Sequence, residues 1–463
     1  MSGINMSSFT SLSLAKEMLD NLNDLNYKVM TPVQEKSIPP ILNGNDVLAQ
    51  AKTGSGKTAA FGIGILHNLN VKLFRVQSLV LCPTRELAEQ VAGELRRVAR
   101  FKHNIKLLKL TGGLPMYKQE LSLKHQAHII VGTPGRILSF LQRGSLDLKN
   151  VKTVVLDEAD RMLDMGFCAQ IKNIISYAPS KRQTLCFSAT FPDEIKKLSK
   201  SVLTNPVEIT VETQHGETVI KQLFYKIPSQ KKVSAVLALL CRHRPQSTII
   251  FCNTKDTCRK VMKELNHSKL HSLALHGDLE QKERDVALIR FANGSTRVLV
   301  ATDVAARGID INDLGAIINY DLPFEKEIYV HRIGRTGRAG REGLALSLME
   351  PGEDFRIDEI NIFCNTDFKP IDPDFEYSIE TPDLEPEMVT LSINGGRKTK
   401  ISAGDILGTL TAKDGINGSD VGKIDRMDYL TFVAIKRKSA KRALNILETG
   451  IIKGKRYLAM LND

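Results

Sequence analysis

A glycine-rich segment near the N-terminus has the composition of a phosphate-binding loop. It reads Ala51-Lys-Thr-Gly-Ser-Gly-Lys-Thr58. Gly54 and Gly56 let the backbone wrap a phosphate with its N–H groups pointing inward, at the expected N-terminus of a helix. Lys57 would neutralise charge on the β- and γ-phosphates of a nucleotide, and the Thr58 hydroxyl would be a ligand of Mg²⁺. The residues that we expect around the phosphates are Thr53, Gly54, Ser55, Gly56, Lys57 and Thr58.

An acidic tetrapeptide, Asp157-Glu158-Ala159-Asp160, directly follows the apolar run Val-Val-Leu. A carboxylate at the end of a buried strand that faces a phosphate-binding loop can hold Mg²⁺, and its neighbour can orient and deprotonate an attacking water. We therefore assign Asp157 to the metal and Glu158 to the general base. Taken alone, such a run is more often the acidic start of a helix. The phosphate-binding loop about 100 residues upstream favours the catalytic interpretation.

A basic segment, His331-Arg-Ile-Gly-Arg-Thr-Gly-Arg338, carries three arginines at a spacing of three residues. Glycines make this a poor helix, and the like charges repel one another unless an anion binds among them. Arg335 and Arg338 are candidate arginine fingers for a γ-phosphate, delivered from a second lobe. Taken alone, a solvated basic stretch is the commoner explanation.

Short apolar runs that alternate with amphipathic stretches fill the first 370 residues, a pattern typical of parallel sheets covered by helices. In residues 86–101, Leu87, Val91, Leu95 and Val98 fall on one face of a predicted helix. A break around residues 205–220 separates two such units, and ligands of open parallel sheets bind at the carboxyl ends of the strands. The predicted strands are 78–82, 129–132, 153–156, 184–187, 248–252, 297–301 and 316–319.

Composition excludes several classes of protein. The chain has 463 residues, of which 42% are hydrophobic and 25% charged, close to the globular average. It lacks an apolar run of the ~18 residues that a membrane span needs, and its N-terminus does not resemble a signal peptide. Seven cysteines without a Cys-x-x-Cys pair predict reduced, buried thiols. We expect a cytoplasmic protein that is not bound to a membrane. Its formal charge of +12 makes a polyanionic partner plausible.

The C-terminal quarter differs from the rest. Residues 371–387 hold seven acidic residues, three prolines and no basic residue, which predicts a linker. Residues 388–463 hold 14 Lys and Arg against seven Asp and Glu, and their hairpin-like runs predict a small α+β module. Its basic side chains include Lys436, Arg437 and Lys438. From the residues alone, an RNA grip and a solvated or protein-docking domain are about equally supported.

From about Phe9 to residue 370, the chain resembles the DEAD-box ATP-dependent RNA helicases, whose namesake motif it carries at residues 157–160. The resemblance implies that Gln34, in Thr31-Pro-Val-Gln34, reads the adenine of ATP and that Phe9 stacks on it. Ser188-Ala-Thr190 is similar to the motif that couples hydrolysis to unwinding. Gly308 and Asp310 match the positions near the phosphates and the ribose. Asn26 stands where the family usually has glycine, and asparagine tolerates a positive φ.

The same resemblance implies an RNA track over both lobes. Backbone amides, hydroxyls and arginines suit contacts to phosphates and 2′-OH groups, which do not read sequence. In the first lobe the matching residues are Pro83, Thr84, Arg85, Gly112, Gly113, Thr133, Pro134, Gly135 and Arg136. In the second lobe they are Thr254, Gly277, Gln281, Arg284, Thr302 and Arg307.

The C-terminal module is similar to the RNA-binding domain of one bacterial subgroup of the family. That similarity covers Gly404-Asp-Ile-Leu-Gly408 and Thr431-Phe-Val-Ala-Ile435. It implies that the module, including Lys436, Arg437 and Lys438, binds a hairpin of 23S rRNA in a precursor of the large ribosomal subunit. An RNA recognition motif stacks bases on aromatic side chains at fixed strand positions, and aromatic residues are sparse here.

The resulting prediction is an α/β fold with two tandem RecA-like parallel-sheet domains, followed by a small α+β domain similar to an RNA recognition motif. The expected boundaries are 1–210 and 211–370 for the helicase domains, 371–387 for the acidic linker and 388–463 for the RNA-binding domain. The predicted activity is ATP-driven, local unwinding of short RNA duplexes, with ATP and Mg²⁺ bound. Two alternatives stay open: a DNA translocase, which the RNA-type motifs disfavour, and an RNA clamp for which ATP is a conformational switch.

Overall fold

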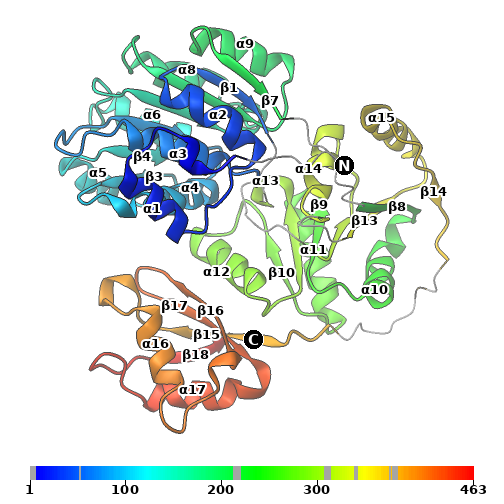
Figure 1. Cartoon of the computed structure of the whole chain (residues 1–463). Helices are drawn as coiled ribbons and strands as arrows, with labels where there is room; N and C mark the ends of the chain where they lie inside the picture. The colour runs from blue at the N-terminus through cyan, green and yellow to red at the C-terminus, as the bar shows by residue number, and fades with distance from the viewer. Residues whose placement is uncertain are drawn as a thin grey trace. The chain divides into compact units, whose positions relative to one another are not determined.

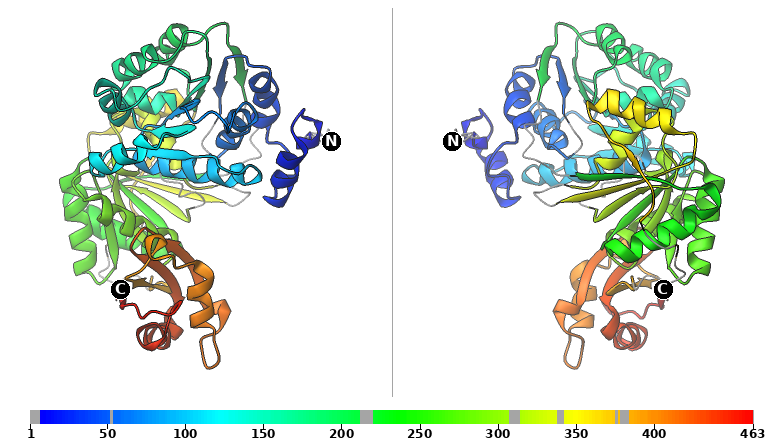
Figure 2. Two further views of the ribbon diagram at one scale, coloured as in Figure 1. Left: turned by 90° about the vertical axis from the view of Figure 1, so that its left-hand side faces the viewer. Right: turned by 90° about the vertical axis from the view of Figure 1, so that its right-hand side faces the viewer.

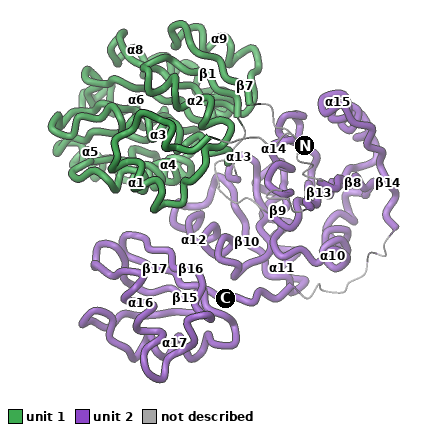
Figure 3. The backbone as a smooth tube through the Cα atoms, in the orientation of Figure 1, with its two compact units in different colours: residues 1–214, 308–310 green, residues 215–307, 311–463 purple. Residues whose placement is uncertain are grey.

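The computed structural model divides the chain into two compact units (Figure 3). Residues 1–214 with 308–310 form unit 1, and residues 215–307 with 311–463 form unit 2. The structure describes residues 7–51, 54–211, 220–306, 314–337, 342–374, 377 and 384–462. Each unit contains a seven-stranded sheet, and unit 2 also contains a separate four-stranded sheet.

The sheet of unit 1 has the strand order β3-β4-β2-β5-β6-β1-β7, and all neighbouring pairs are parallel. Strands β1, β3, β4 and β7 of this sheet are labelled in Figure 1. The central strands are apolar on both faces, because helices cover both sides of a parallel sheet. The strands are β1 (Val47–Gln50), β2 (Ser78–Leu81), β3 (Leu107–Leu110), β4 (Ile129–Gly132), β5 (Thr153–Asp157), β6 (Gln183–Ser188) and β7 (Val207–Thr210).

Two groups of helices enclose this sheet (Figure 2). One face packs against α1 (Lys16–Asp24), α2 (Pro32–Leu42), α3 (Lys57–His67) and α4 (Arg85–Val98). The other packs against α5 (Met116–Lys124), α6 (Pro134–Gln142), α7 (Ala159–Asp164), α8 (Cys168–Ser176) and α9 (Asp193–Val202). Alternation along the strands separates the two cores, since Val80 and Val131 belong to the first and Leu79 and Ile130 to the second.

The large sheet of unit 2 has the order β10-β11-β9-β12-β13-β8-β14 and is also parallel throughout. Its strands are β8 (Ile220–Lys226), β9 (Thr248–Cys252), β10 (Ser272–Leu275), β11 (Val298–Thr302), β12 (Ala316–Asn319), β13 (Gly343–Met349) and β14 (Pro370–Ile371). Its helices are α10 (Lys232–His243), α11 (Lys255–His267), α12 (Gln281–Ala292), α13 (Asp303–Ala306), α14 (Lys326–Ile333) and α15 (Asp354–Cys364). Helices α10 and α11 share one core with the sheet, and α14 and α15 share another.

The C-terminal domain has the element order β-α-β-β-α-β and an antiparallel sheet with the order β16-β17-β15-β18. Its elements are β15 (Met388–Ile393), α16 (Ala403–Leu410), β16 (Val421–Arg426), β17 (Thr431–Lys436), α17 (Ala440–Thr449) and β18 (Ala459–Asn462). Both helices cover the same face of the sheet, where Leu391 and Val433 pack against Ile406 and Leu447.

The predicted fold class is confirmed. All seven predicted strands are present, with ends that differ by at most one residue, and the four residues chosen for the first amphipathic helix are buried along α4. The seven cysteines form no disulfide, and four of them are buried. In the described ranges, no helix combines the length and hydropathy that crossing a membrane requires.

Candidate functional site

The glycine-rich loop leads from β1 into α3, and its conformation depends on glycine. Gly54 and Gly56 have φ angles of 83° and 93°, in the left-handed region that L side chains disfavour. Gly56 is the N-cap of α3, and a Cβ atom there would collide with the amide of Gln34. The loop therefore brings backbone N–H groups to the positive end of a helix, which suits a phosphate.

Lys57 and Thr58 occupy the first turn of α3. Lys57 is only 5% exposed, and its Nζ donates a hydrogen bond of 3.0 Å to the carbonyl of Ala51 at the start of the loop. The backbone N–H of Ala51 in turn donates to the carbonyl of Ser188 at the end of β6. The lysine is thus held inside the loop that a phosphate would occupy, with one hydrogen bond to exchange for the ligand.

Gln34 connects the predicted adenine-reading segment to this loop. Thr31 and Gln34 form a capping box at the start of α2, in which the Thr31 N–H donates to Gln34 Oε1 at 2.9 Å. Gln34 Nε2 also donates to the carbonyl of Gly56 at 3.1 Å, and Thr31 Oγ1 donates to that of Ser55 at 2.7 Å. A base that binds Gln34 would therefore act on the phosphate loop as well.

Phe9 and Asn26 lie in the segment that precedes Gln34. Phe9 is 2% exposed and packs edge-on to Tyr27, with ring centroids 6.0 Å apart. Its stacking on adenine stays a prediction, since a ring this buried must open a face before a base can stack. Asn26 has a φ of 64°, in the left-handed region that asparagine tolerates better than most residues.

Asp157 ends β5 and is 2% exposed, and its Oδ1 has no hydrogen-bond partner within the described residues. Burial raises the pKa of this carboxyl to about 6; Lys57 opposes the rise, and Glu158 adds to it. A buried, unpartnered carboxylate oxygen beside a lysine is costly, and such an atom indicates that a cation or ligand belongs there.

Glu158 is held in an unusual backbone conformation. Its φ and ψ are 53° and 54°, and it is the residue before α7. Its Oε2 accepts a hydrogen bond of 2.6 Å from Arg161, and both side chains are almost fully buried. Strain of this kind persists where the surrounding structure fixes it, and it is concentrated at functional sites.

Asp160 binds the segment that follows β6. Its Oδ2 accepts hydrogen bonds from the N–H groups of Ala189 and Thr190, at 3.0 and 2.9 Å, and from the Thr190 hydroxyl at 3.0 Å. Ser188 Oγ accepts from the N–H of Asp160 at 3.3 Å and donates to the carbonyl of Thr190 at 2.7 Å. The segment predicted to couple hydrolysis to unwinding is therefore bonded directly to the acidic motif.

The residues around Asp157 fit Mg²⁺. A hard cation takes oxygen ligands, and the unpartnered Asp157 oxygen and the Thr58 hydroxyl at the start of α3 are both of this kind. In the part of the chain that the structure describes, no group of three His, Cys, Asp or Glu side chains could hold a metal. A protein magnesium site usually uses one or two carboxylates, together with water and substrate phosphates.

The predicted RNA track of unit 1 lies at the carboxyl edge of its sheet. Thr84 follows β2 and caps α4, where its Oγ1 accepts from the Leu87 N–H at 3.2 Å. Gly112 and Gly113 follow β3, and Thr133 follows β4 as the N-cap of α6. Pro83 lies directly before Thr84, and Pro134 and Gly135 begin α6. Two helix N-termini thus meet this edge, an arrangement that favours phosphate oxygens.

Arg85 and Arg136 belong to this edge. The Arg85 guanidinium lies against Gly112 and Gly113, where any Cβ on Gly113 would collide with it. Arg136 donates a hydrogen bond of 3.1 Å to the carbonyl of Leu114. Burial lowers the pKa of Arg136, and the charge of Arg85 lowers it further. Two neighbouring cations of this kind suit an anionic ligand.

In unit 2, the first arginine of the basic segment, Arg332, is buried and paired within the chain. Its side chain is 1% exposed and forms two hydrogen bonds of 2.7 Å with the Asp303 carboxylate. It also donates to Asn253 Oδ1 at 2.8 Å. For Arg332 the anion that the cluster of like charges was expected to need is supplied by the chain itself, because Asp303 balances its charge. Arg335, two residues beyond α14, is 7% exposed.

The other predicted RNA contacts of unit 2 also follow parallel strands. Thr254 caps α11 after β9, accepting from the Thr257 N–H at 3.1 Å, and Gly277 follows β10. Gln281 begins α12 and donates to Asp285 at 2.9 Å, and Arg284 is half-buried one turn on. Thr302 is the last residue of β11.

The three basic residues chosen in the C-terminal domain contact acidic or carbonyl groups. Lys436 and Lys438 lie 3.4 and 3.3 Å from Asp420 Oδ1. Arg437 donates to the carbonyl of Pro386 at 3.1 Å and pairs with Glu385 at 3.3 Å. The Lys438 side chain is 71% exposed and is the most accessible of the three.

The outer face of the same sheet explains why an aromatic platform is hard to recognise. Since Leu391 and Val433 face the helices, alternation places Thr390, Phe432 and Ala434 on the other face. Phe432 is the aromatic residue among them, and it is only 2% exposed. A ring so buried cannot stack on a base in this conformation.

Five predicted site residues lie outside the described residues: Thr53, Arg307, Gly308, Asp310 and Arg338.

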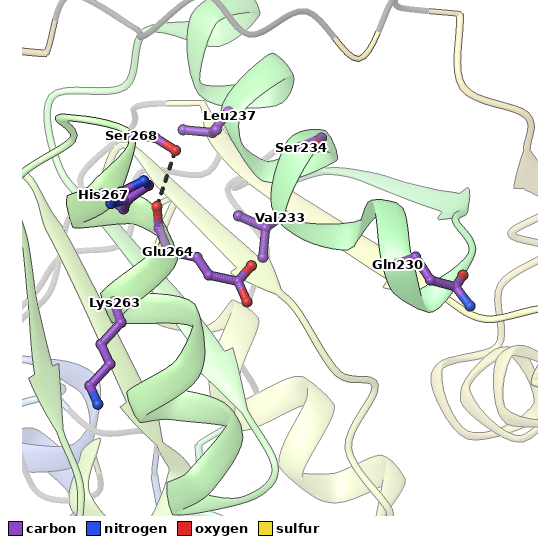
Figure 4. Close-up of a pocket in the computed structure, with 8 residues that line it drawn as sticks. All are labelled: Gln230, Val233, Ser234, Leu237, Lys263, Glu264, His267 and Ser268. Atoms are coloured by element: carbon purple, nitrogen blue, oxygen red, sulfur yellow. Dashed lines mark hydrogen bonds between the residues drawn. The ribbon is translucent and has the colours of Figure 1, made fainter.

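A separate cavity of about 510 Å³ lies between α10 and α11, lined by Val233, Leu237, Glu264 and their neighbours (Figure 4). None of the predicted site residues lines it.

The sequence analysis assigned no separate role to Asp160 or Arg332. In the structure, Asp160 bonds the segment after β6 to the acidic motif, and Arg332 joins Asp303 and Asn253 at the carboxyl edge of the sheet of unit 2. For Asp160 a signal existed, since it belongs to the acidic motif. For Arg332 the signal was ambiguous, because its partners Asp303 and Asn253 are distant in sequence and meet it only in the folded sheet.

Comparison with family models matches three segments. Residues 31–198 match the DEAD/DEAH box helicase family, residues 231–340 the helicase conserved C-terminal domain and residues 390–460 the DbpA RNA binding domain. The third match covers most of the antiparallel C-terminal domain.

Among characterised proteins, the chain is 50% identical to the ATP-dependent RNA helicase DbpA of Escherichia coli, over 97% of this chain and 98% of that protein. It is 37% identical to DbpA of Bacillus subtilis, again over 97% and 98%. Among solved structures, Saccharomyces cerevisiae Dbp5 bound to RNA and ADP BeF3 covers 79% of this chain and 96% of its own, at 31% identity and a TM-score of 0.72. Mss116p bound to ssRNA and AMP-PNP covers 82% of each chain, at 28% identity and a TM-score of 0.72.

Proposed function

The chain belongs to the DEAD-box ATP-dependent RNA helicases, and we propose that it unwinds short duplexes in 23S rRNA during assembly of the large ribosomal subunit. Its C-terminal domain would bring it to that RNA. The observation that carries the proposal is the match of residues 390–460 to the DbpA RNA binding domain, in a chain that also matches both helicase domains. An assembling ribosome also implies a cytoplasmic location.

The proposed ATP site uses the residues around the phosphate loop. Gln34 would bind adenine, the N–H groups of residues 54–56 would bind phosphates, and Lys57 would exchange its bond to Ala51 for the β- and γ-phosphates. Mg²⁺, held through Asp157 and Thr58, would neutralise charge that develops on the phosphates. Glu158 would orient the attacking water and accept its proton.

The second lobe would complete this site. Arg335 and Arg338 would stabilise the charge of the transferred phosphoryl group, as arginine fingers do. They belong to unit 2, whereas Lys57 and Glu158 belong to unit 1. Hydrolysis would therefore require ATP and RNA to bring the two lobes together, and this requirement makes the ATPase dependent on RNA.

The bond network of Asp160 supports the proposed coupling role of Ser188 and Thr190. Asp160 is three residues from Asp157, and its carboxylate holds the backbone and hydroxyl of Thr190. A change in the acidic motif on hydrolysis would thus reach the segment after β6 through hydrogen bonds, without a new contact. Arg85 and Arg136, which we propose contact RNA, lie in helices that follow β2 and β4 of the same sheet.

The test measures ATPase activity with three RNAs: 23S rRNA, a scrambled structured RNA and poly(A), with single-stranded DNA as a further arm. The full chain is compared with a chain ending at residue 387, which removes the C-terminal domain but keeps β14 and Leu384 with the second lobe. We expect strong stimulation by 23S rRNA that the truncation removes. Equal stimulation by every RNA in both chains would contradict the ribosomal target, and equal stimulation by DNA would favour a DNA translocase.

A second measurement separates a helicase from an RNA clamp. Unwinding of a short labelled duplex adjoining the 23S rRNA element is followed together with RNA dissociation. A helicase releases RNA with each round of hydrolysis, so the dissociation rate should rise with ATP. Slow turnover with RNA that stays bound would support the clamp instead.

A further inference from the structure

One face of the C-terminal sheet is not covered by the helices of that domain, and yet the side chains at its centre are buried. Thr390 and Ala434 are fully buried and Phe432 is 2% exposed, although α16 and α17 pack on the opposite face. Side chains on an open sheet face normally contact water. Another part of the chain must therefore cover this one.

The contact to Thr390 comes from the turn that follows α12 in the same unit. Asn293 Nδ2 donates a hydrogen bond of 2.9 Å to Thr390 Oγ1, and the Ser295 hydroxyl lies 2.6 Å from the same oxygen. Asn293 is 8% exposed and Ser295 6%. We call these three residues the Thr390 contact. Every polar group in it has a partner, as buried polar groups require.

The turn itself is pre-formed for this contact. Asn293 caps α12, and its Oδ1 accepts from the N–H and the hydroxyl of Ser295 at 3.1 and 2.8 Å. That arrangement leaves Asn293 Nδ2 directed at Thr390. Gly294, between them, has a φ of 76°, which the tight turn needs. The two side chains are thus held in place by their own loop before the domain arrives.

Residues before β15 also bind the second lobe. Leu384 is 5% exposed and belongs to the apolar core shared with α10 and α11. The Asp374 carboxylate pairs with Arg242, and the Lys231 ammonium lies 4.7 Å from the ring centroid of Tyr377. These described residues of the predicted acidic linker therefore contact the lobe, which a free tether would not do.

We propose that the outer sheet face of the C-terminal domain is a docking surface for the second helicase lobe, fastened by the Thr390 contact. RNA held by the domain then moves with that lobe as one rigid body. The inference goes beyond the proposed function, because docking depends on no particular RNA. It also follows that bases cannot stack on this face while it is docked, so the domain must bind RNA with another surface.

The test measures one distance in the full-length chain without RNA. Spin labels replace Lys263 on α11 and Lys441 on α17, both exposed, in a chain whose partly exposed Cys168, Cys241 and Cys364 are serine. Double electron–electron resonance gives the distance distribution. We expect one narrow distribution for the docked domain. A broad distribution in this reference chain would overturn the proposal.

Variants on both sides of the contact sharpen the result. Thr390→Val removes the hydroxyl at nearly constant volume, leaves two buried polar groups unpaired and should raise the undocked population about tenfold. Thr390→Ser keeps the hydroxyl and should stay docked. Asn293→Ala changes only the lobe and should undock the domain even if changes in β15 disturb its folding. Ser419→Lys, on an exposed site of the same domain, is the control. A distribution as narrow in Thr390→Val and Asn293→Ala as in the control would overturn the proposal.

Discussion

The two parallel sheets have the same topology. Counted from the first strand of each, the order is third, fourth, second, fifth, sixth, first, seventh in both units. Loops that leave equivalent strands can therefore be compared directly. At the carboxyl edge of the sheets, the loops in one half have the same features in both lobes, whereas the loops in the other half differ between the lobes.

The shared half comprises the loops after the second, third and fourth strands. Thr84 and Thr254 each follow the second strand and cap the next helix with a side-chain hydrogen bond. A glycine-containing loop follows the third strand in both, at Gly112 and Gly277. Helix caps and glycines suit phosphate contacts that do not read bases, which supports the proposal that each of these edges contacts an RNA backbone.

The half that differs surrounds the lysine at the start of the helix after the first strand. In unit 1 this is Lys57, bonded to a carbonyl near an Asp157 oxygen that has no partner among the described residues. In unit 2 it is Lys232, whose Nζ lies 3.5 Å from Asp321 and 3.1 Å from Glu350. In the second lobe the lysine is thus paired with acidic side chains of the chain itself. In the first lobe the lysine has no such partner, and the nearby Asp157 keeps a carboxylate oxygen without a hydrogen bond among the described residues. The unpartnered Asp157 oxygen beside Lys57, more than the shared topology, marks unit 1 as the candidate site of ATP hydrolysis.

The largest expected effect is on catalysis in unit 1. Glu158→Gln removes the proposed base while keeping the shape of the side chain. The maximal rate of RNA-stimulated ATP hydrolysis should fall roughly 100-fold to 10,000-fold. ATP affinity, measured separately with a fluorescent nucleotide, should change little. A loss of less than tenfold would remove Glu158 from the role of general base.

Lys232→Met in unit 2 is the matched control for Lys57→Met in unit 1. Lys57→Met should abolish ATPase activity, because a charge at the phosphates is lost. Lys232→Met should leave the rate within a few-fold and lower the free energy of unfolding by ~1–3 kcal/mol, since it breaks a buried ion pair whose acids are partly solvated. Urea denaturation followed by circular dichroism measures the second effect. Equal ATPase loss in both variants would contradict the division between the lobes.

The next largest effect is a loss of folding stability in unit 2, at the loops that follow its second and fourth strands. Arg332→Ala strands the Asp303 carboxylate and the Asn253 amide in a site where the arginine was 1% exposed. The free energy of unfolding should fall by about 3–5 kcal/mol. The exposed Lys196–Asp193 pair of unit 1 is the comparison, and Lys196→Ala should cost ~0.5 kcal/mol or less. Similar losses in the two variants would show that burial does not decide the difference.

A smaller effect should separate two activities. Replacing Ser188 and Thr190 together by alanine removes both hydroxyls that hydrogen-bond Asp160 but keeps the two backbone hydrogen bonds to its carboxylate. ATPase activity should stay largely intact while duplex unwinding falls about tenfold, the equivalent of about 1.4 kcal/mol. Parallel assays on the same preparation test this. Equal loss of both activities would refute the coupling role.

The sequence predicts the shared architecture well and the internal ion pairs poorly. Strands such as 129–132 and 248–252 are short apolar runs between polar segments, and their ends follow from local pattern. The phosphate loop is equally local, since Gly54 to Thr58 are contiguous. Arg332 and Lys232 are different, because their carboxylate partners Asp303, Asp321 and Glu350 follow the ends of other strands and become neighbours only in the folded sheet. The Thr390 contact was missed for the same reason.

The smallest expected effect tests an exposed loop of the shared half. Asp278 pairs with Lys255 and Arg259, and hydrogen bonds from both lower the pKa of its carboxyl below 3.8. The stabilisation is therefore present above the unfolded pKa and is lost as the pH falls through the folded pKa. The melting temperature of the native chain should exceed that of Asp278→Asn slightly at pH 5–7, and the difference should shrink as acidification protonates the Asp278 carboxyl. A difference that does not vary with pH would mean that the charge of Asp278 does not stabilise this loop. The loop after the third strand would then depend on backbone geometry and packing, as the loop at Gly112 in unit 1 does.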